Sequence, residues 1–256
     1  MKKFIVVILL TASSVFLLTL ASCSKPSPKA QVMVAFVIDD WGWNKKYIDL
    51  ALSIERPLAI SILPNLPYSG YVAEKFRDSE IGHDIILHLP LESESNRAAE
   101  ADTIRVDMDK KTMLSILEKD LAGLPMAVGV SNHQGSKATK DKELMKSVLD
   151  KIKKENLFFF DSLTTPDSAC SKIAGDIKLK FAERDVFLDI TNQSDPKNIE
   201  SYVRGQIREL AGVALKKGRA IGVGHNKKTT LNVLKELIPE LEGKGIKVVP
   251  LREMIK

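Results

Sequence analysis

Short apolar stretches rich in β-branched residues alternate with longer amphipathic, charged stretches along most of this chain. The apolar stretches predict strands at 32–39, 58–63, 84–89, 127–131, 157–161, 186–190, 219–225 and 246–251. The amphipathic stretches predict helices at 45–55, 68–80, 110–121, 140–155, 168–176, 197–217 and 228–242. Continuously apolar strands indicate a sheet covered on both faces, and their alternation with helices indicates parallel strands.

This order of elements predicts an α/β fold. About eight strand–helix units in one domain fit a deformed (β/α) barrel of mostly parallel strands, and a doubly wound open sheet is the alternative. The stretch 90–109 is charged and follows neither pattern, so we expect it to be a loop over one face.

The first residues have the pattern of an export signal. Two lysines precede an apolar run that ends in the sequence LASC, with Cys23 as its last residue. This ending resembles the bacterial lipobox, so we expect residues 1–23 to be a lipoprotein signal peptide and Cys23 to carry lipid. Residues 24–30 then form a Pro/Ser linker and residues 31–256 a single domain. An uncleaved membrane anchor is the alternative for the apolar run.

These features predict an exported protein held in the bacterial cell envelope by the lipid on Cys23, at the outer membrane where the host has one. The chain has 38 basic and 33 acidic residues, a net charge of +5. Without residues 1–23, which contain two lysines, the charge is 36 − 33 = +3, so it indicates no nucleic-acid partner. Cys170, the other of the two cysteines, then has no partner for an internal disulfide. The sequence leaves the oligomeric state open.

Titratable side chains stand at the carboxyl ends of the predicted strands. They are Asp39, Asp40, His88, His133, Asp161, Asp189 and His225. The carboxyl ends of parallel strands meet at one rim, where α/β barrels and open sheets place their sites. Three of the four histidines of the chain occupy such positions, so we expect a functional site at this rim.

Several candidates also have a structural interpretation. An Asp after a strand commonly caps the next helix. For Asp161 we weigh this structural role and a role in the site equally. His88 lies between leucines, where a buried core histidine is the alternative, and His83 precedes its strand and is expected to be structural. Trp41 and Trp43 either pack in the core or offer faces on which a sugar ring stacks.

Two histidines and a carboxylate leave open positions on a divalent metal. Zinc is the default for such ligands, and cobalt, nickel and iron are the alternatives. A metal in such a site polarises a carbonyl oxygen and lowers the pKa of bound water. Asp39 or Asp40 is then available as a base and His225 as an acid. Metal, water, base and acid at one rim predict hydrolysis of an amide or an ester.

Six blocks of this sequence resemble the divergent polysaccharide deacetylases, an outlying branch of the metal-dependent polysaccharide deacetylases. The blocks are VIDDWG (37–42), GHDIILHLPLE (82–92), VGVSNHQGS (128–136), FFFDSLTT (158–165), RDVFLD (184–189) and AIGVGH (220–225). The resemblance implies a deformed (β/α) barrel with a metal on one Asp and two His.

The resemblance also implies residue roles. Asp39 would be the base and His225 the acid. The metal ligands would be Asp40, His88 and His133. Arg184 and Asp185 would tune the base or hold the acid. We further expect the substrate pocket to be lined by Trp41, Asn132, Asp161 and Asp189.

This chain departs from the family pattern at several positions. The usual deacetylases take both histidine ligands from one H-x-x-x-H turn, which this chain lacks, so His133 as second ligand rests on its place at a strand end. The divergent branch itself is closer to HLPME, NNHMGS and GHP, from which Leu91, Ser131, Gln134 and Asn226 differ. Except for Leu91, these positions touch the pocket lining, so the differences bear on substrate identity more than on metal binding.

The sequence thus predicts an envelope-tethered, metal-dependent hydrolase that removes N- or O-acetyl groups from a cell-envelope or secreted polysaccharide. The alternative is a non-catalytic carbohydrate-binding or assembly factor that keeps the fold, against which the intact acid–base set argues. An iron-dependent oxygenase would use the same ligand types, but those ligands more naturally lie on a β-sandwich.

Overall fold

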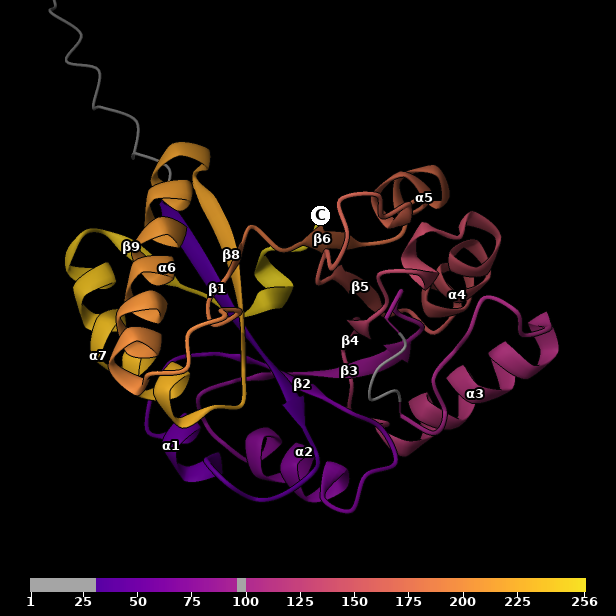
Figure 1. Ribbon diagram of the computed structural model, residues 1–256, viewed down its shortest axis with the longest axis horizontal. Coiled ribbons are helices and arrows are strands. Elements are labelled where there is room, and N and C mark those ends of the chain that lie inside the picture. The colour runs from indigo at the N-terminus through magenta and orange to yellow at the C-terminus, as the bar shows by residue number, and fades with distance from the viewer. Residues whose placement is uncertain (1–30, 96–99) are drawn as a thin grey trace, which may run out of the picture. The chain divides into compact units, whose positions relative to one another are not determined.

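The computed structural model describes residues 31–95 and 100–256, in which strands and helices alternate (Figure 1). The strands are β1 (Val32–Trp41), β2 (Ala59–Ile62), β3 (Asp84–Leu91), β4 (Gly129–Gln134), β5 (Phe158–Asp161), β6 (Phe181–Glu183), β7 (Val186–Phe187), β8 (Arg219–His225) and β9 (Ile246–Val248). The helices are α1 (Ile48–Leu52), α2 (Ser69–Arg77), α3 (Lys110–Gly123), α4 (Lys142–Lys154), α5 (Cys170–Ile177), α6 (Pro196–Lys217) and α7 (Lys228–Gly243). The expected signal peptide, the linker and the lipidation site Cys23 lie outside the described residues.

The strands form one nine-stranded parallel sheet. Its order is β6-β5-β4-β3-β2-β1-β8-β7, and β9 pairs with the beginning of β1. Consecutive strands are neighbours from β1 to β6, which is the order of a barrel opened between β6 and β7 rather than that of a doubly wound sheet. The predicted deformed (β/α) barrel is therefore confirmed, as a curled sheet whose two end strands do not pair within the described part of the chain.

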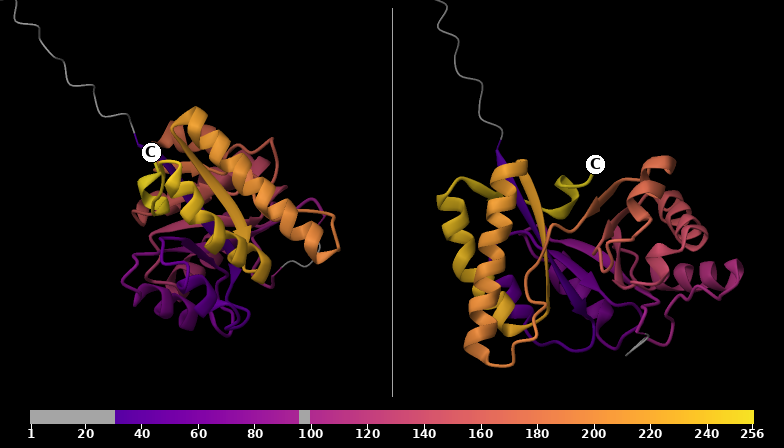
Figure 2. Two further views of the ribbon diagram at one scale, coloured as in Figure 1. Left: turned by 90° about the vertical axis from the view of Figure 1, so that its left-hand side faces the viewer. Right: turned by 45° about the horizontal axis from the view of Figure 1, so that its top comes forward.

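The sheet separates two apolar cores, because successive side chains of a strand point to opposite faces. On β1, Val34, Phe36 and Ile38 belong to the larger core between the sheet and the helices. Ala35 and Val37 belong to a smaller core inside the curl. Figure 2 shows the helices outside the sheet, with α6 and α7 side by side along β8 and β1. Side chains of the inner face at the carboxyl ends of the strands therefore meet above the smaller core.

Local sequence fixes where the longer helices begin and end. Asp109, Asp141 and Asp195 each accept hydrogen bonds from backbone N–H groups of the first turn of α3, α4 and α6, which satisfies donors that lack partners in the helix. Gly218 ends α6 with φ 81°, a conformation that glycine adopts at little cost. Among the described residues, no helix combines the length and apolarity needed to span a bilayer.

Candidate metal centre

The carboxyl end of β1 contains a bulge at Asp40. Ile38 pairs with Ile60 and Trp41 with Ile62, so β1 has one residue more than β2 over this interval. Asp40 has φ 67°, in the left-handed region that few residues other than glycine adopt. In a regular strand Asp39 and Asp40 would point to opposite faces of the sheet. With the bulge, the carboxylates of both residues lie near the same histidine ring, that of His88.

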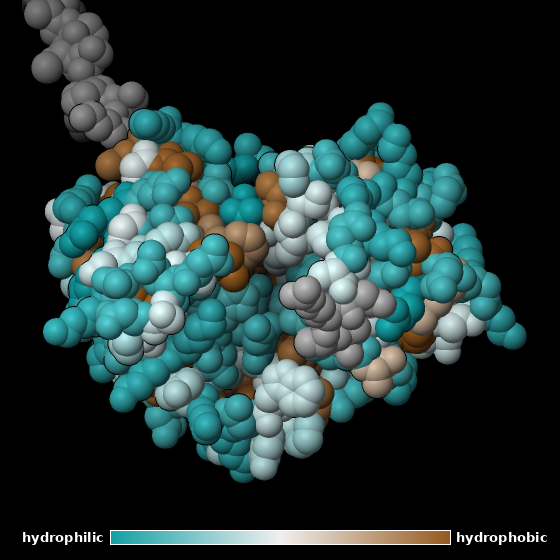
Figure 3. All heavy atoms as spheres, viewed as in Figure 1, coloured by the Kyte–Doolittle hydropathy of each residue, from teal (hydrophilic) through white to brown (hydrophobic). Residues whose placement is uncertain are grey.

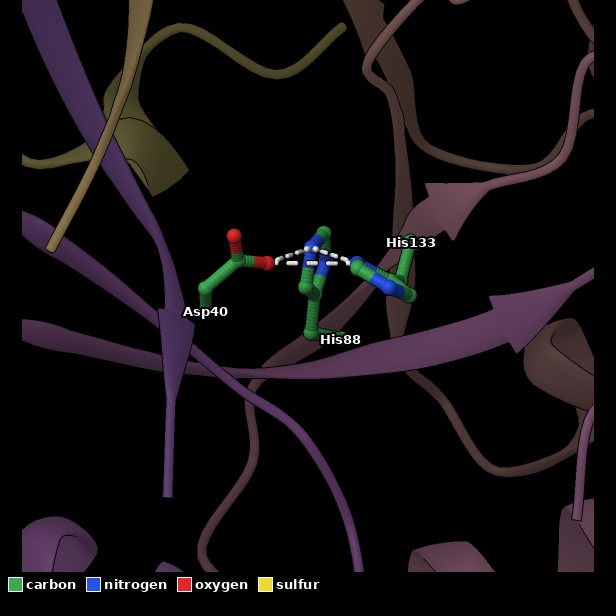
Figure 4. Close-up of side chains that lie close together, drawn as sticks. All are labelled: Asp40, His88 and His133. Atoms are coloured by element: carbon green, nitrogen blue, oxygen red, sulfur yellow. Dashed lines mark hydrogen bonds and ion pairs between the residues drawn. The ribbon is translucent and has the colours of Figure 1, made fainter. Parts of the chain in front are cut away.

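Asp40, His88 and His133 bring three ligand atoms together from β1, β3 and β4 (Figure 4). Asp40 Oδ1 lies 3.4 Å from His88 Nε2 and 3.2 Å from His133 Nδ1. The two ring nitrogens are 3.2 Å apart. Tetrahedral zinc with bonds of about 2.0–2.1 Å separates neighbouring ligand atoms by about 3.3 Å. The predicted set is thus brought together at spacings that suit a small divalent cation.

The electrostatics of this cluster favour a cation among the three side chains. Burial alone would raise the pKa of Asp40, but hydrogen bonds from His133 and His88 hold it well below its usual value. Burial opposes a charge on His133, yet Asp40 and Glu100 outweigh it and raise the pKa of this histidine to about 9. The carboxylates that hold this proton on His133 also favour a divalent metal, which would replace the proton on binding.

A chain of two buried hydroxyls reaches the far side of His88. Ser131 Oγ lies 2.9 Å from His88 Nδ1, and Ser61 Oγ lies 2.8 Å from Ser131 Oγ. Both serines are fully buried on the inner face, on the strands that flank β3. When Nε2 faces a metal, the proton of His88 sits on Nδ1, and Ser131 is the acceptor for it.

Glu100 supports His133 in the same way, and the sequence did not single it out. Its Oε1 lies 3.2 Å from His133 Nε2, the ring nitrogen that points away from Asp40. Glu100 belongs to the segment between β3 and α3, which is anchored to the sheet by hydrogen bonds of Ile104 with Pro90 and Glu92. No strand precedes Glu100 directly, so the strand-end pattern could not identify it.

Asp39 lies beside the three ligand residues on the inner face. Its Oδ2 is 3.7 Å from His88 Nε2, and its buried Oδ1 has no hydrogen-bond partner. Burial raises the pKa of Asp39, and the positive charges of His88 and His225 only partly oppose this. A buried carboxyl group with a free oxygen next to a metal position can accept a proton from a small polar molecule there.

His225 faces the same site from β8, where it pairs in register with Asp39. Its Nδ1 lies 2.6 Å from Asp189 Oδ1, and Asp189 Oδ2 accepts hydrogen bonds from the His225 backbone and from Thr230. Burial opposes a charge on His225, but Asp189 outweighs it and raises the pKa. Burial alone would raise the pKa of Asp189, and the bonds from His225 and Thr230 lower it to about 2. Asp189 thus holds His225, instead of lining the substrate pocket as predicted.

Three other residues predicted to contact substrate have structural roles. Trp41 is fully buried and packs edge-on against Phe76 of α2, so its face is closed to a sugar ring. Asn132 is fully buried, where its amide donates to Gln134 O and accepts from Ser162 N. Asp161 accepts hydrogen bonds from Leu163 N and Ser168 Oγ. The predictions for Trp41, Asn132 and Asp161 are wrong because these side chains serve packing and turns.

Arg184 and Asp185 do not join the cluster either. Arg184 donates to the carbonyls of Ser162 and Leu163 and lies over the ring of Phe187. Asp185 forms an ion pair with Lys217 and accepts a hydrogen bond from Ile221 N. Ile221 lies in β8, four residues before His225. These contacts replace the predicted role of tuning the base or holding the acid. His83 is buried, and its Nδ1 accepts from Leu58 N, in agreement with its predicted structural role.

The family model of the divergent polysaccharide deacetylases matches residues 36–255 of this chain. An uncharacterised protein of Escherichia coli K12, YibQ, is 30% identical over 215 residues, which are 84% of this chain and 65% of that protein. The chain thus spans somewhat less than two thirds of this relative's length.

Two solved structures have a similar fold. The uncharacterised protein ATU2773 of Agrobacterium tumefaciens C58 has a TM-score of 0.80 at 22% identity, over 90% of this chain and 92% of that one. The catalytic domain of a peptidoglycan N-acetylglucosamine deacetylase from Eubacterium rectale has a TM-score of 0.56 at 12% identity, over 90% and 93%. At these identities the similarity establishes the fold.

Proposed function

We propose that this chain, which belongs to the divergent polysaccharide deacetylase family, is a metal-dependent hydrolase that removes acetyl groups from a cell-envelope polysaccharide. The observation that carries the proposal is the convergence of Asp40, His88 and His133 within 3.4 Å of one another. Asp39 and His225 flank this set, so one rim holds the metal ligands and two groups that can exchange protons.

Asp40, His88 and His133 would hold the metal, and two nitrogen donors with one carboxylate oxygen make zinc our choice over cobalt, nickel or iron. A divalent metal in such a site polarises the acyl oxygen of the substrate and lowers the pKa of bound water. The hydroxyl of Ser131 and the carboxylate of Glu100 fix which nitrogen of each imidazole faces the metal position.

Asp39 is the proposed general base. It takes the proton of the attacking water through a carboxyl oxygen that has no other partner. Because burial raises its pKa, Asp39 is a stronger base than an exposed carboxylate.

His225 is the proposed general acid. Its Nδ1 is engaged by Asp189, which leaves Nε2 to donate a proton to the departing nitrogen or oxygen of the sugar. The raised pKa keeps the ring protonated until that step. Base and acid thus belong to paired positions of two adjacent strands.

The proposed place of action is the bacterial cell envelope. Support comes from the sequence LASC, which is typical of lipoprotein signals and would put a lipid on Cys23. An acetylated envelope polysaccharide would then lie within reach of the domain. Labelling with radioactive palmitate should fail in a Cys23→Ser variant, and unchanged labelling would contradict the anchor.

The function is tested by acetate release from acetylated peptidoglycan and other acetylated glycans. Asp39→Asn keeps the shape of the side chain but removes the base, so we expect a 10²–10⁴-fold lower kcat. Bound zinc per chain should stay unchanged, because Asp39 is not among the three ligands. Asp185→Asn, which lies away from the cluster, is the control and should retain activity. Equal rates for wild type and Asp39→Asn would instead favour a non-catalytic carbohydrate-binding or assembly factor.

A further inference from the structure

Exposed aromatic side chains gather just after β1 and β2, on the two loops that follow these strands and in the first turn of α2. Seven large hydrophobic side chains are exposed among the described residues, and four of them are aromatic. These four are Trp43, Tyr47, Tyr68 and Tyr71. Such a concentration in two short segments is not expected from packing, which would bury the rings.

The two loops lie at the rim of the candidate metal centre. In the sheet, β2 stands between β1 and β3, the strands that carry Asp40 and His88. The backbone ties the loops together, since Tyr68 N donates to Gly42 O and Leu63 N to Trp41 O. Figure 3 shows this side of the molecule, hollowed near its centre, with pale residues of intermediate hydropathy below the hollow, over α2.

Lys45 lies among these rings without a carboxylate partner. Its Nζ is 3.8 Å from the centre of the Tyr71 ring and 5.5 Å from that of Tyr68. No acidic group of the described residues forms an ion pair with it. The two tyrosine faces therefore hold the ammonium group, and its N–H bonds that point away from the rings are available to a ligand. Trp43 stands two positions away with 54% of its surface exposed.

We propose that Trp43 and Lys45 form a subsite for the sugar unit next to the one being deacetylated. The apolar face of a sugar ring would stack on the Trp43 indole, and its oxygen atoms would accept hydrogen bonds from Lys45, which Tyr68 and Tyr71 position. The three tyrosines carry hydroxyl groups and are only 36–38% exposed, against 54% for Trp43. A protein-docking patch would need a larger contiguous apolar surface than these four side chains offer. The inference rests on the proposed function and adds to it which residues of this chain would hold the neighbouring sugar unit of the polysaccharide.

Tryptophan fluorescence tests the subsite directly, because the chain has two tryptophans and Trp41 is fully buried. Soluble peptidoglycan glycan strands, added to the zinc-loaded full-length Asp39→Asn protein, should shift the emission to the blue. They should also reduce acrylamide quenching several-fold, whereas monomeric N-acetylglucosamine at the same sugar concentration should do neither. Both signals should disappear in a Trp43→Ala variant of that protein.

Variants of Tyr71 test the support of Lys45. Tyr71→Leu, which removes the ring face, should weaken binding of the glycan strands about tenfold, and Tyr71→Phe, which keeps it, should bind as before. Leu215→Ala changes an exposed side chain on α6 and is the control. Two results would overturn the subsite: unchanged Trp43 emission with glycan strands, or equal binding of these strands by Tyr71→Leu and the parent protein. The exposed aromatic side chains would then be assigned to contact with a protein partner.

The same measurements separate this inference from the proposed function. Acetate release by the wild type without a response of Trp43 would remove the subsite alone. A response of Trp43 without acetate release would remove the hydrolase and keep the subsite, now as part of a carbohydrate-binding protein.

Discussion

Each histidine of the candidate metal centre has a second partner behind it. Ser131 meets Nδ1 of His88, and Glu100 meets Nε2 of His133, so the two rings offer opposite nitrogens to the metal position. Hydrogen bonds of this kind set the tautomer and orientation of a ligand histidine before the metal arrives. These two residues are therefore expected to govern how tightly the metal is held.

Replacing Glu100 by Gln should weaken zinc binding 10–100-fold, because the carboxylate that orients and polarises His133 is lost. Competition with a chromogenic chelator measures the Kd. Glu94→Gln, on the same segment and paired with Lys140, is the matched control and should leave the Kd unchanged. Equal affinities for Glu100→Gln and wild type would mean that Glu100 does not act through His133.

His83 predicts how stability depends on pH. Burial lowers its pKa to about 4, against the usual 6.5 of an unfolded chain. The folded state binds the proton more weakly, so this stability is complete above about pH 6.5 and is lost as the pH falls towards 4. The loss amounts to at most about 3 kcal/mol. In His83→Asn an amide oxygen can still accept from Leu58 N, so the free energy of unfolding should vary less between pH 7 and 4. Urea titrations at several pH values test this, and parallel pH curves for the two proteins would contradict it.

The alternation of side chains along each strand explains which predicted site residues the structure brings together. Asp39, His88 and His225 lie on the inner face, each two residues after a residue of the inner core, namely Val37, Ile86 and Val223. His133 likewise lies two residues after Ser131, which contacts His88. Asp161 follows Phe160 of that core and so points to the helices. Position at a strand end does not by itself tell the two faces of the sheet apart, whereas the alternation of side chains along the strand does.

Other residues of the site could not be predicted in that way. In a regular strand the side chain of Asp40 would point to the outer face of the sheet, and only the bulge brings it to the metal position. The acidic pair and the family pattern, and not the alternation along the strand, therefore point to Asp40 as a ligand. Glu100 stands in an irregular segment with several other acidic residues, and nothing in the sequence marks it. Ser61 is recognisable in the sequence as a hydroxyl between two isoleucines of a buried strand.

At the scale of elements, the eight predicted strands and seven predicted helices are all present, with ends that differ by a few residues. Strong apolar runs and the amphipathic stretches between them sufficed for this. The sequence analysis missed β6, because Phe181–Glu183 is a three-residue strand inside a charged stretch. This omission matters for the fold, since β6 is one of the two end strands at which the barrel stays open.

Gly129 shows how closely β4 and β5 pack. A Cβ atom at this position would overlap the ring of Phe158 in the inner core. We expect Gly129→Ala to lower the free energy of unfolding by about 1–3 kcal/mol, which denaturant titration measures.

A matched change at Gly175 is the control for this prediction. It lies in α5 with no atom within 4 Å of the added methyl group, so Gly175→Ala should be neutral or stabilising by up to about 1 kcal/mol. A Gly129→Ala protein as stable as wild type would contradict the packing derived for the inner core.

At the scale of the whole molecule, the candidate centre joins parts of the chain that are distant in sequence. Asp40, His88 and His133 lie in the carboxyl-terminal halves of three strands of one curled sheet, and Asp39 and His225 stand opposite each other on two of its strands. The parallel topology alone brings these carboxyl ends to a common rim. We propose that this rim binds one metal through two imidazoles and a carboxylate.

X-ray absorption at the zinc K edge of the zinc-loaded full-length protein tests this claim most directly. We predict one zinc per chain with a first shell of nitrogen and oxygen, and outer-shell scattering from two imidazole rings. In His133→Ala the scattering should fall to that of one ring, or zinc should be lost. Zinc bound without imidazole scattering, or a spectrum unchanged in His133→Ala, would contradict the account.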